Sequence, residues 1–347
     1  MSSQQITLTR PDDWHLHLRD GAVLARAALD SARCFARALV MPNLQTPVTT
    51  VAQAAAYRES ILAVLPEDSD FKPLMSLYLT DTTPPEEIDR AAESGVVYAV
   101  KLYPAGATTH SSQGVRDLDS VHPVLERMQE RDLPLLIHGE VTDPQVDVFD
   151  RERVFIDRHL TTLTKAHPAL RVVLEHVSTA EGVAFVRSAP ETVAATITAH
   201  HLLLNRNALF EDGFRPHHYC LPVVKREEDR QAILAAATGG EPCFFLGTDS
   251  APHLRSQKES EAGRAGIYTA PVAMELYAEI FEAAGCLQRL EAFASFFGAD
   301  FYRLPRNTSQ LSLEARDWPV PNELPVADEG GIVPFRAGES LHWRLVT

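Results

Sequence analysis

The chain has 347 residues, of which 45% are hydrophobic and 23% are charged, and a chain of this length and composition can bury a large globular core. Its formal net charge of −15, with no cluster of lysine or arginine to offset it, argues against nucleic acid as a partner. The N-terminal residues contain no apolar run typical of a signal peptide, and no segment is long enough to cross a bilayer, so we expect a soluble, cytoplasmic protein without a membrane partner.

Eight short apolar runs, each bounded by turn residues, are predicted to form strands. They cover residues 13–18, 35–42, 72–79, 96–103, 133–139, 171–177, 193–200 and 243–249. Segments with helical periodicity lie between them and predict helices over residues 50–65, 85–94, 120–131, 151–166, 179–188 and 227–238. This alternation of strands and helices predicts that the strands pair in parallel.

Eight nearly apolar strands are the number that closes a (β/α)8 barrel, so we expect an α/β protein with the TIM-barrel fold. A doubly wound open sheet is the alternative, but the sequence lacks the G-x-G-x-x-G turn of that fold, which also argues against a nucleotide cofactor. Two further helices, over residues 271–284 and 290–301, would complete the outer ring. We expect one domain over residues 1–347, with a barrel over about residues 7–302 and an irregular C-terminal extension over about 303–347 that contains a short strand pair.

The four cysteines are scattered without C-x-x-C spacing, which argues against a disulfide framework and against a thiolate zinc cluster. We interpret Cys34, Cys220, Cys243 and Cys286 as reduced and mostly buried residues.

The first predicted strand carries an unusual polar face. Successive side chains of a strand point to opposite faces, so His15, His17 and Arg19 would share one face. The opposite face would carry the apolar side chains Trp14, Leu16 and Leu18. Two imidazoles at this spacing can bind one metal ion, although a His-x-His pair alone is a weak signal.

Further polar residues fall at the carboxyl ends of the other predicted strands. The full set is His15, His17, Asn43, Lys101, His138, His176 and Asp249. In a (β/α)8 barrel these strand ends form the rim where catalytic residues collect, so we expect the seven side chains to converge. This convergence is a much stronger signal than any single histidine.

Lys101 stands in a run that otherwise reads as buried, where an unpaired ammonium group is costly. It could pair with a carboxylate, form a Schiff base or remain uncharged. A neutral amine could also react with carbon dioxide to give a carbamate, whose two oxygens can bridge two metal ions. The sequence pattern leaves these alternatives open, although the histidines on the same rim favour a metal-linked role.

Four histidines and Asp249 are more ligands than one catalytic zinc ion needs, because such a site usually takes three protein ligands. Two metal ions sharing a bridge would use all of them. Paired metal ions can activate water as a nucleophile and polarise a carbonyl group. The predicted reaction class is therefore metal-assisted hydrolysis or its reversal.

Six stretches, in this order along the chain, resemble motifs of one enzyme family. They are WHLHLR at residues 14–19, MPN at 41–43, VKLYP at 100–104, IHGE at 137–140, LEHVS at 174–178 and GTDSAPH at 247–253. Over about residues 7–302 the chain resembles the dihydroorotases of the amidohydrolase superfamily, in particular their short, homodimeric bacterial form. The resemblance implies a reversible cyclisation of N-carbamoyl-L-aspartate to L-dihydroorotate in pyrimidine biosynthesis, and a homodimer.

The resemblance also implies two Zn²⁺ ions per subunit. By this resemblance His15, His17 and Asp249 bind the more buried ion, and His138 and His176 bind the second. Lys101 would be carbamylated to N6-carboxylysine and would bridge the two ions together with a hydroxide. The hydroxide would attack the ring amide carbonyl, and Asp249 would carry its proton to the leaving nitrogen.

The remaining family positions concern the substrate. The resemblance implies that Arg19, Asn43 and His253 bind the substrate carboxylate, and the planar guanidinium of Arg19 suits a carboxylate. Backbone groups near Leu221 and Ala265 would contact the ring edges. Thr108 and Thr109 match a mobile lid loop.

His200 and His201 follow the seventh predicted strand, and we interpret them as hydrogen-bonded supports, since the family pattern does not assign them to metal.

A hydantoinase or allantoinase is the alternative function among enzymes. The three residues expected to bind the substrate carboxylate, Arg19, Asn43 and His253, argue against it. A non-catalytic barrel that supports another pyrimidine enzyme is the second alternative, but such a barrel is expected to lack ligands that are present here.

Overall fold

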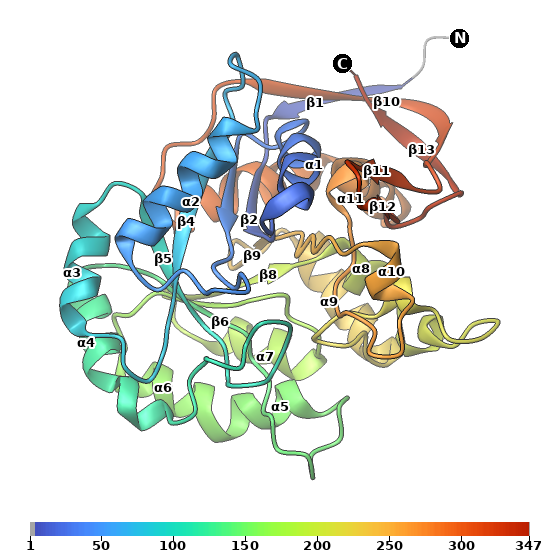
Figure 1. The fold of residues 1–347 in the computed structure, drawn as a ribbon. Helices are drawn as coiled ribbons and strands as arrows, with labels where there is room; N and C mark the ends of the chain where they lie inside the picture. The colour runs from blue at the N-terminus through green and yellow to red at the C-terminus, as the bar shows by residue number, and fades with distance from the viewer. Residues whose placement is uncertain (1–3, 347) are drawn as a thin grey trace.

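A barrel of eight parallel strands forms the centre of the protein (Figure 1), which we describe from a computed structural model of residues 4–346. The strands pair in the order in which they occur along the chain. They are β2 (Asp12–Leu16), β3 (Arg37–Val40), β4 (Lys72–Tyr78), β5 (Val97–Leu102), β6 (Leu135–Ile137), β7 (Val172–Leu174), β8 (Val193–Ile197) and β9 (Phe244–Leu246). The eight predicted strands and the TIM-barrel fold are therefore confirmed.

The barrel closes just beyond the end of β9. Leu16 forms a parallel bridge with Ser250. The Asp249 N–H donates to the His15 carbonyl at 2.9 Å, and the His17 N–H donates to the Ser250 carbonyl at 3.1 Å. The same backbone hydrogen bonds that close the barrel therefore hold the first and last predicted metal ligands side by side.

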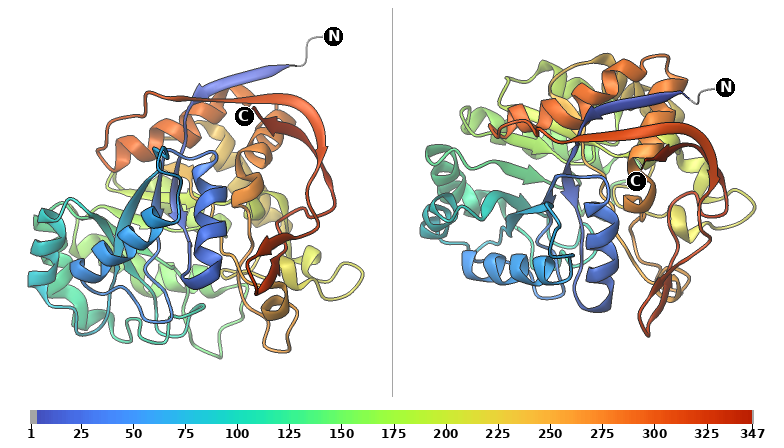
Figure 2. Two further views of the ribbon diagram at one scale, coloured as in Figure 1. Left: turned by 45° about the horizontal axis from the view of Figure 1, so that its top comes forward. Right: turned by 90° about the horizontal axis from the view of Figure 1, so that it is seen from above.

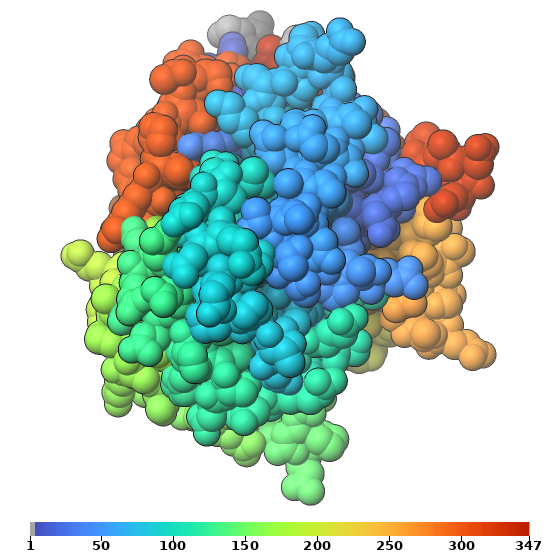
Figure 3. All heavy atoms as spheres, turned by 60° about the vertical axis from the view of Figure 1, so that its left-hand side comes forward, coloured from blue at the N-terminus to red at the C-terminus, as the bar shows by residue number. Residues whose placement is uncertain are grey.

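Helices surround the barrel. They are α1 (Gly21–Ala32), α2 (Val51–Ala63), α3 (Pro85–Glu93), α4 (His122–Glu130), α5 (Arg151–Phe155), α6 (Thr161–Ala166), α7 (Ala180–Ser188), α8 (Ala199–Leu203), α9 (Glu227–Gly239), α10 (Arg255–Lys258), α11 (Ala273–Ala283) and α12 (Phe297–Phe301). Figure 3 shows the side of the molecule covered by the segments of α2, α3 and α4. Within residues 4–346, no helix combines the length and the apolar character needed to span a membrane.

Local sequence signals account for several helix starts. The Thr50 hydroxyl accepts from the Gln53 N–H, and the Gln53 side chain returns to the Thr50 N–H, so α2 begins with a capping box. Helix α3 begins with Pro85 and has two acidic residues in its first turn, which suits the positive end of the helix dipole. Helix α1 (Gly21–Ala32) was not among the helices predicted from the sequence.

The barrel interior is a separate apolar cluster with a contribution from each of the eight strands. Its buried strand residues are Trp14, Leu39, Leu74, Ala99, Leu136, Val173, Ala194 and Phe245, and Met41 joins them just after β3. Tyr302 closes the cluster from outside the sheet, since its ring stacks on Trp14 at 4.3 Å between centroids. A Cβ on Gly298 would lie 2.0 Å from the Trp14 ring nitrogen, so only glycine fits there.

The prediction that Trp14 shares a face with Leu16 and Leu18 is wrong. Trp14 lies in the interior cluster, whereas Leu16 and Leu18 pack in the larger cluster of the protein. The physical reason is a register shift between β2 and β3, located between Asp13 and Leu16, which breaks the strict alternation of faces.

The C-terminal segment is more regular than the predicted irregular extension with a short strand pair. Strand β10 (Gln310–Pro319) pairs with both β1 (Gln5–Thr9) and β13 (Ser340–Leu345), so the two ends of the chain share one antiparallel sheet (Figure 2). The predicted short pair is formed by β11 (Leu324–Val326) and β12 (Gly330–Ile332).

Candidate active site

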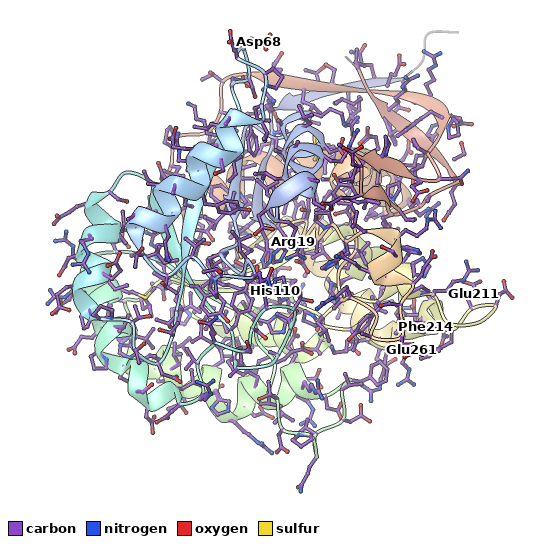
Figure 4. The ribbon with its side chains drawn as sticks, in the orientation of Figure 1. Arg19, Asp68, His110, Glu211, Phe214 and Glu261 are labelled. Atoms are coloured by element: carbon purple, nitrogen blue, oxygen red, sulfur yellow. The ribbon has the colours of Figure 1, made fainter. Side chains whose placement is uncertain are left out.

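The predicted site residues converge at the carboxyl ends of the barrel strands. Arg19, labelled in Figure 4, lies near the centre of the molecule, close to His110 of the segment that follows β5. Arg19, His176 and Asp249 all have left-handed backbone conformations, with φ values of 62°, 43° and 45°. The chain therefore turns sharply at three of these strand ends, and such strained positions are typical of functional sites.

His15, His17 and Asp249 form a compact group of potential metal ligands. His15 Nε2 lies 3.3 Å from His17 Nε2. The same two nitrogens lie 3.3 and 3.0 Å from Asp249 Oδ1. Two nitrogens bound to one tetrahedral zinc ion at about 2.05 Å would be about 3.3 Å apart, so this spacing fits a shared metal ion.

Glu175 fixes the ring of His15. Its Oε2 accepts a hydrogen bond from His15 Nδ1 and a second from the Thr196 hydroxyl at 2.8 Å. Because Nδ1 donates to this carboxylate, Nε2 is left as the free nitrogen that faces Asp249. Both His15 and Glu175 are fully buried.

Glu140 plays the same part for His138. His138 Nε2 donates to Glu140 Oε2 at 2.9 Å, which leaves the other ring nitrogen as the potential ligand. The buried Lys225 ammonium lies 3.6 Å from Glu140 Oε1 and donates to the Val223 carbonyl at 3.0 Å. The Lys225 ammonium thus balances the charge of the Glu140 carboxylate, which in turn accepts the hydrogen bond from His138.

Three of the four predicted ligand histidines have lowered pKa values, whereas for His15 the nearby carboxylates, Glu175 first, outweigh burial and raise the pKa. Burial and the neighbouring Arg19 guanidinium lower the pKa of His17 to about 3. Burial lowers the pKa of His138, and burial together with His138 lowers that of His176 well below the usual range. These imidazoles are therefore neutral at pH 7, as metal ligands must be.

Lys101 is fully buried, and its Nζ has no hydrogen-bond partner anywhere in residues 4–346. Burial lowers the pKa of this amine to about 8. The nitrogen lies 5.1 Å from the centre of the Tyr103 ring. An unpaired, partly neutral amine among metal-ligand residues is chemically suited to carbamylation.

Asp249 is held as a carboxylate. Burial alone would raise its pKa, but the contacts with His15 and His17 outweigh burial and hold the pKa well below the usual value. The preceding turn is fixed by Asp13, which accepts hydrogen bonds from the Thr248 N–H at 2.9 Å and from the Thr248 hydroxyl at 2.5 Å. Burial raises the pKa of Asp13 itself to about 7.

Arg19 and His253 lie side by side next to the ligand group. Arg19 Nη2 is 3.1 Å from His253 Nε2, and that nitrogen is 3.0 Å from the Ala265 carbonyl. The Tyr57 hydroxyl donates to the Arg19 carbonyl at 2.6 Å and thereby fixes the backbone that carries the guanidinium. Arg19 is buried with no carboxylate among its hydrogen-bond partners in the described chain, so it is available for an anionic ligand.

The segment after β5 closes over the site. Asn43 Nδ2 donates to the Thr109 carbonyl at 3.0 Å, and Thr108 and Thr109 line the cavity. The cavity also contains Leu221 and Ala265 in its wall and has a volume of about 20 Å³, which is room for about one water molecule. In this conformation the cavity has no room for a substrate ring.

A larger cavity of about 630 Å³ lies outside the predicted site, bordered by Pro104, Val115 and Glu140 among others. Its lining carries charges of both signs. The potential metal ligands and Arg19 line the smaller cavity, so we place the site there and not in the larger one.

His200, His201 and Cys220 also bring potential ligand atoms within 4.8 Å of one another. However, His201 Nε2 and Cys220 Sγ each donate to the Pro222 carbonyl at 3.1 Å, so both atoms carry protons. Burial raises the pKa of Cys220 to about 12, which keeps it a thiol. His201 is thus the hydrogen-bonded support that we expected, whereas His200 has no ring partner within residues 4–346.

All four cysteines are free thiols, and three of them are buried, in agreement with the sequence prediction.

Several residues of the site were not singled out from the sequence. Glu140, Glu175, Asp13 and Thr248 position the ligands, and Tyr103 lines the cavity, with a buried hydroxyl that has no partner among the described residues. A charged residue inside an apolar run was the available signal for Glu140 and Glu175.

Comparisons with known proteins agree with this geometry. The amidohydrolase family model matches residues 12–313. A dihydroorotase of Methylobacillus flagellatus is 62% identical over 340 residues, which cover 98% of each chain. The crystal structure of a dihydroorotase of Campylobacter jejuni has a TM-score of 0.92 and 34% identity, and the match covers 100% of this chain and 99% of that one. A dihydroorotase of Saccharomyces cerevisiae, solved in complex with 5-fluoroorotic acid, has a TM-score of 0.90 and 32% identity over 99% and 98% of the two chains.

Proposed function

The chain belongs to the amidohydrolase family and, within it, to the dihydroorotases of pyrimidine biosynthesis, and we propose that its rim site binds two Zn²⁺ ions and interconverts N-carbamoyl-L-aspartate and L-dihydroorotate. The observation that carries the proposal is the meeting of four histidines and one carboxylate in the wall of a single cavity, with the buried and unpaired amine of Lys101 close to His15, His138 and His176.

The donor set fits two ions better than one. We assign His15, His17 and Asp249 to one ion, supported by their mutual distances of 3.0 to 3.3 Å. We assign His138 and His176 to the second ion, supported by the ring centroids, which are 4.9 Å apart. His176 Nδ1 is buried and has no partner among the described residues, so its lone pair is free to bind a metal ion.

Lys101 is the group we assign to the bridge between the ions, as N6-carboxylysine. Its buried Nζ has no partner within residues 4–346, and a carbamate would replace this isolated amine with two oxygens. The charge of Lys101 acts on His15 of the first group and on His138 and His176 of the second, which supports a place for Lys101 between the two groups of ligands. When bound, the metal ions lower the pKa of water and polarise the amide carbonyl.

Asp249 is the proton carrier of the proposed reaction. In the hydrolytic direction, the water oxygen bonds to the ring carbonyl carbon and the carbon–nitrogen bond breaks. The ionised Asp249 takes the proton of the attacking water and passes it to the departing nitrogen. In the reverse direction the same groups close the ring and release water.

Substrate orientation falls to groups beside the ligands. We propose that Arg19, Asn43 and His253 bind the carboxylate of the substrate, supported by the approach of Arg19 to His253 at 3.1 Å. Leu221 and Ala265 are proposed to contact the ring, because both line the cavity. The yeast dihydroorotase was solved with 5-fluoroorotic acid, a pyrimidine ring with a carboxylate, which is the ligand type that these positions suit.

Thr108 and Thr109 form the proposed lid. Because the cavity beneath them holds about one water molecule, the lid must open to admit substrate and close again to exclude bulk water. The hydrogen bond from Asn43 to Thr109 connects the lid to the carboxylate site. The homodimer and the cytoplasmic location stay predictions from the sequence.

Metal analysis of the purified protein tests the proposal. We expect about two zinc-like ions per chain, and loss of most dihydroorotate turnover after chelation, with recovery when metal is returned. Full turnover in a protein shown to be free of metal would contradict the proposal.

A further inference from the structure

Lys258, at the end of α10, uses its ammonium group in an unusual way. The side chain is buried, and its Nζ donates to three backbone carbonyls: those of Tyr219 at 2.9 Å, Arg264 at 2.7 Å and Gly266 at 2.6 Å. An ammonium group has three N–H donors, so every donor has an acceptor. Burial lowers the pKa of Lys258 to about 8, so the group still carries its proton at pH 7.

The three carbonyls come from the two segments that line one side of the cavity. Arg264 and Gly266 flank Ala265, and Tyr219 lies two residues before Leu221. The Gly266 N–H also donates to the Tyr219 carbonyl at 2.9 Å, so the two segments are joined directly as well as through Lys258. Both Leu221 and Ala265 lie in the cavity wall.

The contact with Arg264 also orients Ala265. A trans peptide group is planar, with its C=O and N–H pointing in opposite directions. Because the Arg264 carbonyl points to Lys258, the Ala265 N–H of the same peptide group points away from Lys258, and Ala265 itself lines the cavity. The Ala265 carbonyl in turn lies 3.0 Å from His253 Nε2, next to Arg19.

The backbone of the segment that contains Ala265 and Gly266 has little freedom to adopt another conformation. A Cβ on Gly266 would lie 2.8 Å from the Ala251 carbonyl oxygen and 3.0 Å from His253 Cδ2, and its φ of +146° disfavours other residues. The backbone is therefore packed closely against the carboxylate site on one side and held by the ammonium on the other.

We propose that Lys258 is a positioning residue for substrate binding: it aims the Ala265 peptide group into the cavity and holds the Leu221 segment against it. The inference rests on the proposed role of Leu221 and Ala265 in contacting the ring. It concerns affinity for the substrate and leaves metal binding and the chemical step to other residues.

Lys258→Met tests this inference, with Lys165→Met as the matched control on the exposed face of α6. The steady-state constants for L-dihydroorotate, the metal content and the amide hydrogen exchange are measured for both variants and for the unaltered enzyme. In Lys258→Met we expect KM to rise about tenfold or more, since hydrogen bonds to a charged group are lost. The value of kcat and the metal content should stay close to those of the control, and exchange should accelerate in peptides that contain residues 219–222 and 264–267.

Lys258→Arg separates positioning from general destabilisation, because it keeps the charge and the donors. We expect its KM to lie between those of the unaltered enzyme and Lys258→Met. If Lys258→Met does not fold, faster exchange confined to the two segments of Lys258→Arg supports the inference, and unchanged exchange there contradicts it. An unchanged KM in folded Lys258→Met, or a loss of metal that accounts for the defect, overturns it. Failure of the unaltered, metal-loaded enzyme to act on dihydroorotate would instead count against the proposed function.

Discussion

Glu175→Gln is expected to weaken metal binding while leaving the barrel folded. Glu175 is fully buried, and its Oε2 accepts from His15 Nδ1 and from the Thr196 hydroxyl. A glutamine has the same shape, and its carbonyl oxygen can accept both hydrogen bonds. The negative charge beside the His15 ring is what the substitution removes, and with it the increased basicity of the nitrogen that faces the metal.

The size of the effect follows from the position of the charge. Removing a carboxylate that orients a metal-bound histidine typically costs 10- to 100-fold in metal affinity, or about 1.4 to 2.7 kcal/mol. The hydrogen bonds to His15 and Thr196 persist in the glutamine variant, so we expect its midpoint of thermal unfolding to change by only a few degrees.

Competition with a chelator of known zinc affinity measures the effect. Apparent dissociation constants are compared for the unaltered protein, Glu175→Gln and the exposed control Glu191→Gln. Equal zinc affinity in all three proteins would refute the argument that Glu175 acts through His15. Equal weakening in both variants would show a general effect of lost charge rather than one transmitted by the ring.

Two other side chains give direct tests. Arg19→Ala should lower kcat/KM for dihydroorotate by about 10- to 100-fold, through the loss of a charge-assisted hydrogen bond to the substrate carboxylate, and unchanged kinetics would exclude this role. Lys101→Ala should abolish turnover, and short carboxylic acids added to this variant should restore a little of it; full activity in the variant would exclude the bridge. Because the pKa of Lys101 is lowered to about 8, its neutral amine is more abundant at higher pH, so at equal concentrations of dissolved carbon dioxide and zinc the metal-free protein should be reactivated faster at about pH 8.5 than at about pH 6.5. The reverse order of rates would count against carbamylation of the amine.

The barrel could be predicted from the sequence because its strands are local apolar runs. The ends of the strands from Arg37 to Leu246 fall within the predicted runs, and the site side chains lie at those ends, with Lys101 inside β5 and Asn43, His138, His176 and Asp249 after their strands. Strand β1 could not be predicted in this way, since Gln5–Thr9 acquires its structure by pairing with β10, some 300 residues later. The face of Trp14 was predicted wrongly for a related reason, because the register shift between β2 and β3 depends on both strands.

The supporting residues of the site were harder to identify than the ligands. Glu175 precedes His176 in the sequence but orients His15, which lies 160 residues away. Lys258 contacts only backbone carbonyls through hydrogen bonds, and a backbone acceptor has no signature in the sequence. A ligand motif is visible as a spacing of residue types, whereas a positioning contact becomes visible only when the chain is folded.

The left-handed turns at Arg19, His176 and Asp249 bear on how this enzyme would respond to selection in the laboratory. An L-amino acid in this conformation costs about 1 to 2 kcal/mol relative to a relaxed backbone, and glycine avoids that cost. Three such positions together are comparable to a sizeable part of the net stability of an ordinary domain. A library screened for heat resistance alone should therefore accumulate glycine at these three positions, and the screened proteins would lose turnover as they become harder to unfold.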